Sequence, residues 1–393
     1  MHKYRLLGKK GEGTFSEVLK AQDIKSNKLV AIKCMKNHFD SVEQVNRLRE
    51  IQALRRLSPH ANIIKLYEVL YDRSTGRLAL VFELMEMNIY ELIRGRRQYL
   101  AEDKVLHYMY QLMKGIDHMH RNGIFHRDIK PENILILNDA LKLADFGSCR
   151  GIYSKQPFTE YISTRWYRAP ECLLTDGYYN YKMDIWGVGC VFFEIMSLYP
   201  LFPGNNELDQ IHKIHNIMGT PPTELLNRLK KFGTHMDFDF PVKQGTGITK
   251  LLPHASPEAL DLMTKLLTYN PEERPSAKQA LKHPYFKEIR EIDRKLRKQK
   301  AGTVADEDDE DGQPQSNNST TNRTGQQDEE DSQRLPPLPV GGSTLPVLTQ
   351  TNKSVPAEVK TNATTGAIPS KSGSLPKGKE ETKTLPKLVP LKR

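Results

Sequence analysis

Cysteine is scarce in this chain and is never paired at a short spacing. The only cysteines among the 393 residues are Cys34, Cys149, Cys172 and Cys190, without a C-x-x-C motif or a Cys/His spacing of zinc-site type. This pattern argues against a disulfide framework and against a structural zinc site. It favours separate reduced thiols in a reducing compartment.

Long hydrophobic runs are lacking as well. No run of about 18 apolar residues is present, and the first residues, MHKYRLLGKKGEG, contain no apolar core of a signal peptide. We therefore expect no membrane span and no secretion signal. The expected location is intracellular and soluble, in the cytoplasm, with the nucleus or the cilium as alternatives that no address signal separates.

Hydrophobic residues make up 38% of the chain and become rare only after about residue 300. The residues before that point carry enough apolar material for a sizeable core. Residues 301–393 begin with acidic stretches such as DEDDEDG and end rich in proline, lysine and threonine, which predicts a disordered tail. Its segment RLPPLPV could bind a signalling partner with an SH3 domain, but the offset of its arginine favours a plain linker.

The net charge of +10 would suit a nucleic-acid partner. However, no basic stripe alternates with aromatic residues, and acidic residues are scattered through the same regions. DNA or RNA binding is therefore not expected as the main role. The basic run KEIREIDRKLRKQK, residues 287–300, is expected to form a solvated helical extension.

Residues 1–84 predict a β-rich region with one helix. Apolar residues recur every three positions from Ser41 to Leu57, which predicts the helix, and Ser41 with Gln44 fits a capping box at its start. Strands are expected within residues 4–35 and near residues 64–71 and 78–84.

After residue 84 the pattern becomes helical. Val105, Met109, Leu112, Ile116 and Met119 fall on one face of a long helix, and the helix DIWGVGCVFFEIM is apolar nearly all round, as a buried helix should be. PEALDLMTKLL predicts a further helix, and ILILNDALKLA predicts a β-hairpin that turns at Asn138-Asp139.

A glycine-containing loop, GEGTFSEV, lies between the first two expected strands, from Gly11 to Val18. Glycines allow backbone N–H groups to approach phosphates closely. Ser16 stands where the pattern G-x-G-x-x-G has its third glycine. Because a strand and not a helix follows, the loop does not fit a dinucleotide-binding fold.

Charged residues in three further motifs suggest phosphate and metal chemistry. Lys33 ends the apolar strand VAIK and needs a partner, for which Glu50 on the expected helix is the best candidate. HRDIKPEN brings Asp128, Lys130 and Asn133 onto one loop, and DFG follows at Asp145. Asn133 and Asp145 can offer oxygen ligands to magnesium, Asp128 can accept a hydroxyl proton, and Lys130 can offset phosphoryl charge.

The glycine loop, VAIK, the helix glutamate, HRDxKxxN, DFG and APE follow one another in an order that resembles a eukaryotic protein kinase over residues 4–286. The resemblance implies an α+β, two-lobed kinase fold, with residues 1–84 as the small lobe and 85–286 as the large lobe. It implies ATP in the cleft, with Mg²⁺ held by Asn133 and Asp145. Lys130, two residues after Asp128, resembles serine/threonine kinases.

The same resemblance assigns roles to particular residues. Asp128 would be the catalytic base, assisted by Lys130 and Lys33, and Glu171 of APE would pair with Arg274. The residues that would bind the nucleotide are Gly11, Glu12, Gly13, Thr14, Phe15, Ser16, Val18, Ala31, Lys33, Glu50, Phe82, Glu83 and Met85.

The sequence T-E-Y, Thr159 to Tyr161, lies between DFG and APE and resembles the activation segment of MAP kinases. Phosphates on Thr159 and Tyr161 would each add about −1.5 to −2 charges. Before phosphorylation, five unpaired guanidiniums would disfavour closing of the segment. The resemblance implies that a phosphate on Thr159 would be bound by Arg49, Arg127 and Arg150. It implies that a phosphate on Tyr161 would be bound by Arg165 and Arg168.

Within the family, the chain resembles the branch that joins cyclin-dependent and MAP kinases, and in it the MAK/MRK group. Protein substrates with serine or threonine before proline are expected, with activation by an upstream kinase or by autophosphorylation. A pseudokinase or scaffold is the alternative. It would be indicated by loss of Lys33, Asp128, Asn133 or Asp145, and since all four are present, an active enzyme is favoured.

Overall fold

A computed structural model describes residues 3–159 and 164–305 of the chain. Tyr161 and the predicted tail beyond residue 305 lie outside the described residues. Within the described ranges, the helices are all too short or too polar to cross a membrane.

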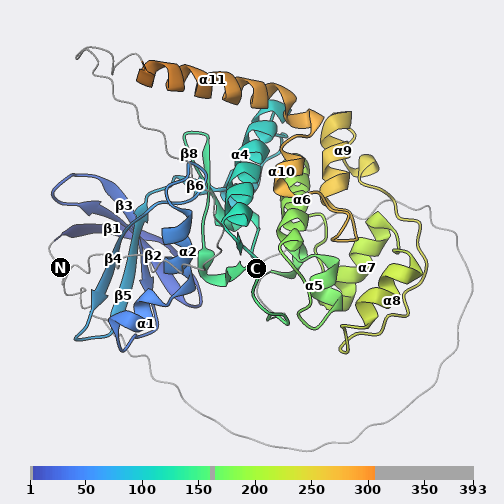
Figure 1. Ribbon diagram of the computed structural model, residues 1–393, viewed down its shortest axis with the longest axis horizontal. Coiled ribbons are helices and arrows are strands. Elements are labelled where there is room, and N and C mark those ends of the chain that lie inside the picture. Colours follow the sequence, from blue (N-terminus) through green and yellow to red (C-terminus); the bar gives the residue numbers. More distant parts are fainter. Residues whose placement is uncertain (1–2, 160–163, 306–393) are drawn as a thin grey trace, which may run out of the picture. The chain divides into compact units, whose positions relative to one another are not determined.

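The N-terminal part is an antiparallel sheet of five strands in the order β1-β2-β3-β5-β4 (Figure 1). β5 is buried on both faces, because Ala79 and Val81 pack with β3 on one side while Leu78 and Leu80 face the main core on the other. The predicted β-rich region is therefore confirmed. The strands are β1 Tyr4–Glu12, β2 Ser16–Asp23, β3 Leu29–Met35, β4 Leu66–Asp72 and β5 Arg77–Glu83.

The single helix predicted from Ser41 to Leu57 is wrong, because the structure has two helices, α1 Val42–Asn46 and α2 Arg49–Leu57. Apolar residues repeated every three positions drift by about 60° per step around a helix of 3.6 residues per turn. A continuous helix could not keep them all on one face. The extended backbone at Leu48 (φ −63°, ψ 128°) breaks the helix, so α2 begins a new buried face.

The capping box predicted at the start of this region is half present. Ser41 Oγ accepts a hydrogen bond from the backbone N–H of Gln44 at 3.2 Å. The Gln44 side chain, however, accepts from the backbone N–H of Asp40 at 2.7 Å instead of that of Ser41. The reciprocal contact is thus displaced by one residue, and α1 still has a satisfied N-terminus.

The C-terminal part is mainly helical, as predicted. Its helices are α3 Ile89–Ile93, α4 Glu102–Arg121, α5 Pro170–Leu174, α6 Lys182–Ser197, α7 Glu207–Met218, α8 Thr223–Lys230, α9 Pro257–Leu266, α10 Ala277–Ala280 and α11 Lys287–Ala305. Short strands are β6 Met87–Asn88, β7 Ile124–Phe125, β8 Ile134–Leu137, β9 Ala140–Leu143 and β10 Arg150–Gly151. Short 3-10 helices are η1 Pro131–Asn133, η2 Phe146–Ser148, η3 Arg165–Tyr167, η4 Thr249–Leu251 and η5 Pro284–Phe286.

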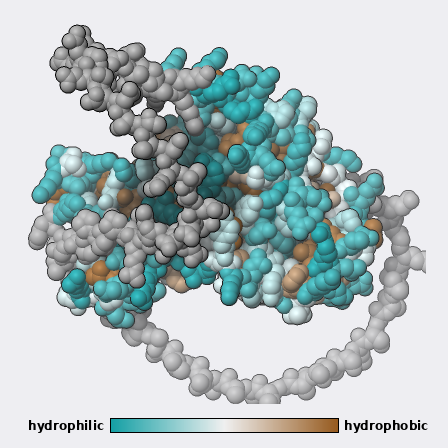
Figure 2. Space-filling view, viewed as in Figure 1, coloured by the Kyte–Doolittle hydropathy of each residue, from teal (hydrophilic) through white to brown (hydrophobic). Residues whose placement is uncertain are grey.

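Helix α6 forms the centre of this part, and every residue from Met183 to Ser197 is buried. It lies beside α4, whose predicted apolar face is also buried (Figure 1). Gly189 allows α9 to pack closely, since a Cβ there would lie 2.7 Å from Leu267 Cγ. Figure 2 shows the complementary surface: hydrophilic residues dominate the visible face, and hydrophobic ones form separate small patches.

The predicted hairpin is present as β8 and β9. Asn138 and Asp139 at its turn both have left-handed backbones (φ 49° and 61°), as a two-residue type I′ turn requires. The hairpin positions the candidate site, because Asn133 directly precedes β8 and Asp145 follows shortly after β9.

The basic segment after the last 3-10 helix is helical, and α11 continues beyond residue 300, where the sequence placed its end, to Ala305. Asp293 on α11 accepts hydrogen bonds from Tyr110 Oη at 3.0 Å and from Lys114 Nζ at 3.1 Å. The helix is therefore attached to α4 by side-chain contacts.

Candidate functional site

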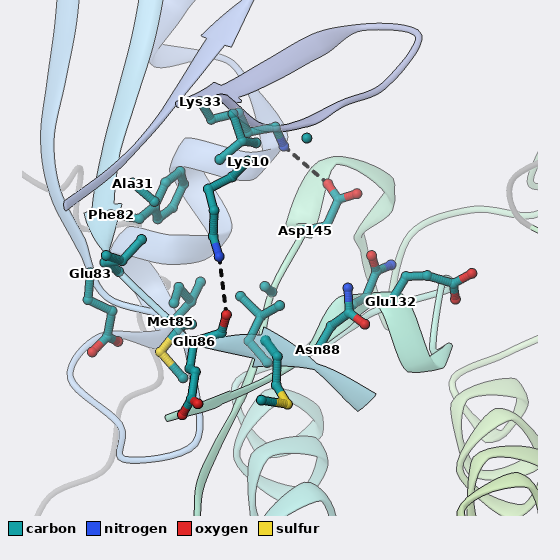
Figure 3. A pocket seen from close by; sticks show the side chains of 18 of the residues that line it. Lys10, Ala31, Lys33, Phe82, Glu83, Met85, Glu86, Asn88, Glu132 and Asp145 are labelled. Atoms are coloured by element: carbon teal, nitrogen blue, oxygen red, sulfur yellow. Dashed lines mark hydrogen bonds and ion pairs between the residues drawn. The ribbon is translucent and has the colours of Figure 1, made fainter. Parts of the chain in front are cut away.

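A cavity of about 320 Å³ opens between the β-sheet and the start of the helical part (Figure 3). Such a volume suits a small organic ligand. Eleven of the predicted site residues line it: Gly11, Ser16, Val18, Ala31, Lys33, Glu50, Phe82, Glu83, Met85, Asn133 and Asp145. The structure thus collects residues from β1, β2, β3, α2, β5 and the DFG region around one space.

Four residues predicted to bind nucleotide do not line the cavity: Glu12, Gly13, Thr14 and Phe15. Glu12 ends β1, residues 13–15 form the turn between β1 and β2, and Phe15 is 69% exposed. Glu12 faces Lys36 and Lys9, at 2.7 and 2.5 Å, and these partners lower its pKa to about 2. The tip of the loop therefore points into solvent, and only its flanking strands reach the cavity.

Lys33 lies at the back of the cavity between two carboxylates. Its Nζ donates to Glu50 Oε1 and Oε2 at 2.7 and 2.9 Å, and to Asp145 Oδ1 at 3.2 Å (Figure 3 shows the latter). Strand β3 holds Lys33 between Val18 on β2 and Leu80 on β5. The predicted contact between Lys33 and Glu50 is thus observed, and it joins the sheet to α2.

The three charges shift one another's pKa values. Burial lowers the pKa of Lys33, but Glu50 and Asp145 outweigh that effect and raise it above its usual value. Burial alone would raise the pKa of Asp145. The charge and hydrogen bond of Lys33 lower it by more, so the net shift is downward. Burial raises the pKa of Glu50 despite Lys33. Lys33 is therefore held as a cation beside the ionised Asp145.

Asp128 lies beside the cavity on the HRDIKPEN loop. Its Oδ2 accepts from Lys130 Nζ at 2.8 Å and from Asn133 Nδ2 at 3.0 Å. Its Oδ1 is buried and has no hydrogen-bond partner among the described residues. Since unpaired buried carboxylate oxygens are costly, this atom is a candidate acceptor for a ligand proton.

A residue without an assigned role in the sequence, Asp184, holds this loop in place. From the first turn of α6 it accepts from the backbone N–H groups of His126 and Arg127 at 2.8 Å each, and it contacts His120 Nε2 at 2.9 Å. Burial would raise the pKa of Asp184, but the hydrogen bond from His120 and the nearby positive charge keep it below its usual value. An ionisable residue opening an otherwise apolar helix was the signal that could have identified it.

Asp145 adopts a left-handed backbone (φ 64°) at the start of the DFG sequence. The next residue, Phe146, is fully buried and packs edge-on against His126, with ring centroids 5.4 Å apart. This packing turns the Phe146 ring into the core and leaves the Asp145 carboxylate facing the cavity (Figure 3).

Further cavity residues were missed by sequence reasoning: Lys10, Ile64, Leu84, Glu86, Met87, Asn88, Glu91, Glu132, Leu135 and Ala144. Leu135 and Ala144 had a usable signal, since they lie beside Asn133 and Asp145 in sequence. Lys10 had none. Its Nζ donates to the backbone carbonyl of Glu86 at 3.2 Å, a contact between the two parts of the molecule (Figure 3).

The expectation of five unpaired guanidiniums is wrong, because four of these arginines donate hydrogen bonds or form an ion pair. Arg127 donates to Ser148 O at 2.7 Å and to Tyr179 Oη at 2.8 Å; Arg150 donates to Cys149 O at 3.2 Å; Arg165 donates to Asn205 O at 3.1 Å; and Arg168 pairs with Glu207 at 3.1 Å. Arg49 begins α2 and is exposed. Of these, Arg127 and Arg168 are buried, and buried donors must find acceptors, here the Ser148 carbonyl, the Tyr179 hydroxyl and the Glu207 carboxylate.

Of the T-E-Y motif, only Thr159 lies within the described residues, and it is exposed. Its backbone carbonyl accepts a hydrogen bond from Tyr179 Oη at 2.7 Å.

Comparison with known proteins agrees with this geometry. The protein kinase domain family matches residues 4–286. The chain is 62% identical to MAPK/MAK/MRK overlapping kinase of Homo sapiens over 295 residues, which cover 75% of this chain and 70% of that protein. The Mus musculus protein of the same name is 64% identical over 286 residues, covering 73% and 68%.

A more distant relative is serine/threonine-protein kinase MAK of Homo sapiens, 43% identical over 287 residues, which cover 73% of this chain and 46% of that protein. The predicted resemblance to the MAK/MRK group and the α+β, two-lobed fold are thereby confirmed. The chain belongs to the protein kinase family, as a serine/threonine kinase of the type that includes MAK and the MAPK/MAK/MRK overlapping kinases.

Proposed function

We propose that the chain transfers the γ-phosphoryl group of ATP to serine or threonine hydroxyls of proteins, with Asp128 as the base and with T-E-Y as a regulatory switch. The observation that carries this proposal is the unpartnered Asp128 Oδ1. Lys130 and Asn133 hold the other carboxylate oxygen, so the unpaired one is oriented to receive a proton.

The cavity supports the nucleotide assignment. Apolar side chains line it, including Val18, Ala31 and Leu135, and they suit the faces of an adenine ring. Glu83 and Met85 follow Phe82 along one edge, where their backbone groups can bind the edge of the base. Lys33 offers a fixed positive charge to the phosphates, because Glu50 and Asp145 hold its amine in place.

The donor set fits magnesium. Asn133 uses its Nδ2 to hold Asp128, which leaves its amide oxygen for another partner, and the Asp145 carboxylate is half exposed beside the cavity. Oxygen ligands of this kind, few in number, match an ion that also binds phosphates and water. When bound, the ion would neutralise phosphate charge.

In the reaction that we propose, this chain's residues bind, orient and accept a proton. Asp128 Oδ1 accepts the proton of the substrate hydroxyl, whose oxygen forms the new bond to the γ-phosphorus as the bond to ADP breaks. Lys130 lies close enough to Asp128 to offset charge on the transferred group. Asp184 keeps the loop in position through the backbone of His126 and Arg127.

We propose that Thr159 and Tyr161 are phosphorylated and that the nearby arginines receive the phosphates. Arg127 and Arg165 use neutral oxygens as acceptors, which a phosphate dianion would outcompete. Arg168 differs, because Glu207 already supplies a carboxylate. The binding of a phosphate on Thr159 by its assigned arginines is therefore better supported than the binding of a phosphate on Tyr161.

Protein substrates follow from the family, and a preference for proline after the target residue is part of the proposal. Phosphorylation of Thr159 and Tyr161 by an upstream kinase and autophosphorylation are both compatible with this proposal, and the comparison of wild type with Asp128→Asn distinguishes them. The intracellular location and the tail's signalling partners stay predictions from the sequence.

The test is mass spectrometry of the purified chain incubated with Mg-ATP and a serine/threonine peptide, with wild type beside Asp128→Asn. Wild type should phosphorylate the peptide, whereas Asp128→Asn should bind ATP and lose turnover by about 10³-fold or more, because the proton acceptor is removed. Lys33→Met should be equally inactive.

Asp117→Asn is the matched control, since it changes an aspartate of α4 that pairs at 2.9 Å with Arg121, whose side chain is 62% exposed, and that does not line the cavity. Turnover of Asp128→Asn within about tenfold of wild type would refute the base assignment. Phosphate on Thr159 or Tyr161 only in wild type would indicate self-modification. An inactive wild type that binds ATP would be treated with upstream kinases, and continued inactivity would favour the scaffold alternative.

A further inference from the structure

Arg127 is buried, yet its guanidinium contacts only neutral groups among the described residues. Its Nε donates to the carbonyl of Ser148 and its Nη1 to the hydroxyl of Tyr179, at 2.7 and 2.8 Å. The ring of Phe158 lies 5.9 Å from the guanidinium carbon. A buried cation needs acceptors, so the loss of any one of these groups would be costly.

The hydroxyl of Tyr179 links Arg127 to the activation segment through two hydrogen bonds. It accepts from Arg127 and donates its own proton to the backbone carbonyl of Thr159 at 2.7 Å. A cation that donates to a phenol oxygen strengthens the donation by its O–H group. Burial raises the pKa of Tyr179 above its usual value, so the hydroxyl stays protonated and remains a donor.

Residues 156–158 are attached to residues 177–179 by two further hydrogen bonds. Gln156 Nε2 donates to the carbonyl of Tyr179 at 2.5 Å, and the backbone N–H of Phe158 donates to Gly177 O at 2.8 Å. Gly177 has a left-handed backbone (φ 86°), and a Cβ there would lie 2.1 Å from Phe158 O. Only glycine fits this close approach.

The Phe158 ring closes the arrangement. It packs between Phe125 and Tyr179, with ring centroids 5.5 and 5.4 Å away. Phe125 immediately precedes the His126–Asp128 loop, so the Phe158 ring packs directly against the chain segment that carries the proposed base.

From these contacts we infer that Tyr179 is a positioning residue that joins the main chain at Thr159 to Arg127 before any phosphate is present, and thereby sets the basal activity. This inference rests on the proposed function, because it takes Asp128 as the base and Thr159 as a phosphate acceptor. A phosphate on Thr159 would give Arg127 a charged acceptor in place of a neutral phenol. The contribution of Tyr179 should therefore be largest in the unphosphorylated chain.

The test uses Tyr179→Phe, which keeps the ring that packs on Phe158 and removes only the hydroxyl. Tyr178→Phe is the matched control. Tyr178 is the preceding residue, its ring packs on Phe232 with centroids 4.8 Å apart, and 38% of its surface is exposed. Both full-length variants and wild type are compared after phosphatase treatment and after phosphorylation of Thr159, with peptide kinetics as the readout.

In the dephosphorylated state, kcat of Tyr179→Phe should fall roughly tenfold, as expected for loss of one charge-assisted hydrogen bond, with the KM for ATP changed by less than about twofold. After phosphorylation of Thr159 the difference should shrink to less than about threefold. Tyr178→Phe should match wild type in both states. An equal loss in both states with a lower Tm would assign Tyr179 a packing role alone and overturn the inference, as would an unchanged basal kcat.

Hydrogen–deuterium exchange provides a readout that needs no catalysis. In dephosphorylated protein without ATP, amides of residues 150–159 should exchange several-fold faster in Tyr179→Phe than in wild type or Tyr178→Phe. Unchanged exchange would overturn the inference. If wild type transferred no phosphate at all, the proposed function would fail, while the exchange result would still decide whether Tyr179 holds the segment.

Discussion

Arg274 and Glu171 form a bidentate ion pair that is almost completely buried. Nη1 and Nη2 of Arg274 lie 2.7 Å from Oε1 and Oε2 of Glu171, and the side chains are 0% and 2% exposed. The other donors of Arg274 reach the backbone carbonyls of Thr268, Tyr269 and Lys182. The contact predicted between APE and PEERPSA is thus present, and it connects the end of the activation segment to the region after α9.

Removal of Arg274 should destabilise the fold strongly. Arg274→Met would leave the Glu171 carboxylate buried without a counter-charge, which typically costs about 3–5 kcal/mol. Equilibrium unfolding in urea would measure this change. Glu171→Gln removes the carboxylate charge that Arg274→Met leaves without a partner. The variant that carries both substitutions should therefore lose less stability than the sum of the two single variants.

The matched control is the exposed pair of Arg228 and Glu272, whose side chains are 53% and 72% exposed at a separation of 3.1 Å. Arg228→Met should change the free energy of unfolding by less than about 1 kcal/mol. If Arg274→Met were as mild as this control, the buried pair would have no special structural role.

Asp184→Asn should impair catalysis more than nucleotide binding. One amide oxygen cannot replace two carboxylate oxygens that accept from His126, Arg127 and His120, and the amide N–H₂ would face a backbone donor. We expect kcat to fall about 10- to 100-fold through displacement of Asp128, with the KM for ATP within about threefold, since Lys33 lies on the sheet. Steady-state kinetics would test this split, and a rise in KM alone would contradict it.

The motifs that form the candidate site could be predicted because their chemistry is local. Lys33, Asp128, Asn133 and Asp145 sit in short sequences whose order resembles a kinase, and the structure brings three of them to one cavity with Asp128 beside it. The strands and long helices were also predictable, since β-branched runs and three-to-four-residue periods reflect local burial.

What could not be predicted depends on contacts between distant segments. Nothing in the sequence pairs Arg168 with Glu207, which lies 39 residues further along on α7. The hydroxyl of Tyr179 likewise meets Arg127 only because the chain folds α6 against the catalytic loop. The expectation of unpaired arginines failed for this reason: tertiary packing supplied acceptors that no motif contains.

Stability should fall on acidification through His215 on α7. Burial, with the nearby His212 and Lys243, lowers the pKa of His215 to about 4 in the fold. The unfolded value is about 6.5, so unfolding takes up a proton between these two pH values. The contribution of His215 to the free energy of unfolding is fully present above pH 6.5 and is lost as pH falls towards 4, by about 3 kcal/mol.

Replacement of this histidine should flatten the profile. His215→Gln keeps a polar side chain opposite Tyr269 Oη, which lies 3.0 Å from His215 Nε2, but does not titrate. Urea unfolding at several pH values should show a smaller loss between pH 6.5 and 4 than in wild type. His38→Gln, at an exposed histidine, is the control, and an unaltered slope in His215→Gln would show that other groups cause the acid sensitivity.

Helix α11 should be part of the folded unit, whereas the chain after residue 305 should be dispensable for folding. Asp293 binds Tyr110 and Lys114, and Arg290 donates to the carbonyl of Leu281 at 2.7 Å. A chain ending at residue 305 should keep the Tm of the full chain. One ending at residue 286 should melt several degrees lower, since each kcal/mol corresponds to about 2–4 °C at this size.

Calorimetry on both truncations and on Asp293→Asn would separate the contributions of this helix. Asp293→Asn should reproduce part of the loss seen at residue 286, because it weakens the contact with Lys114 while leaving the helix in place. A loss of the cooperative transition in the chain ending at residue 305 would show that the tail supports the fold. An unchanged Tm at residue 286 would show instead that the contacts of α11 with α4 add nothing to stability.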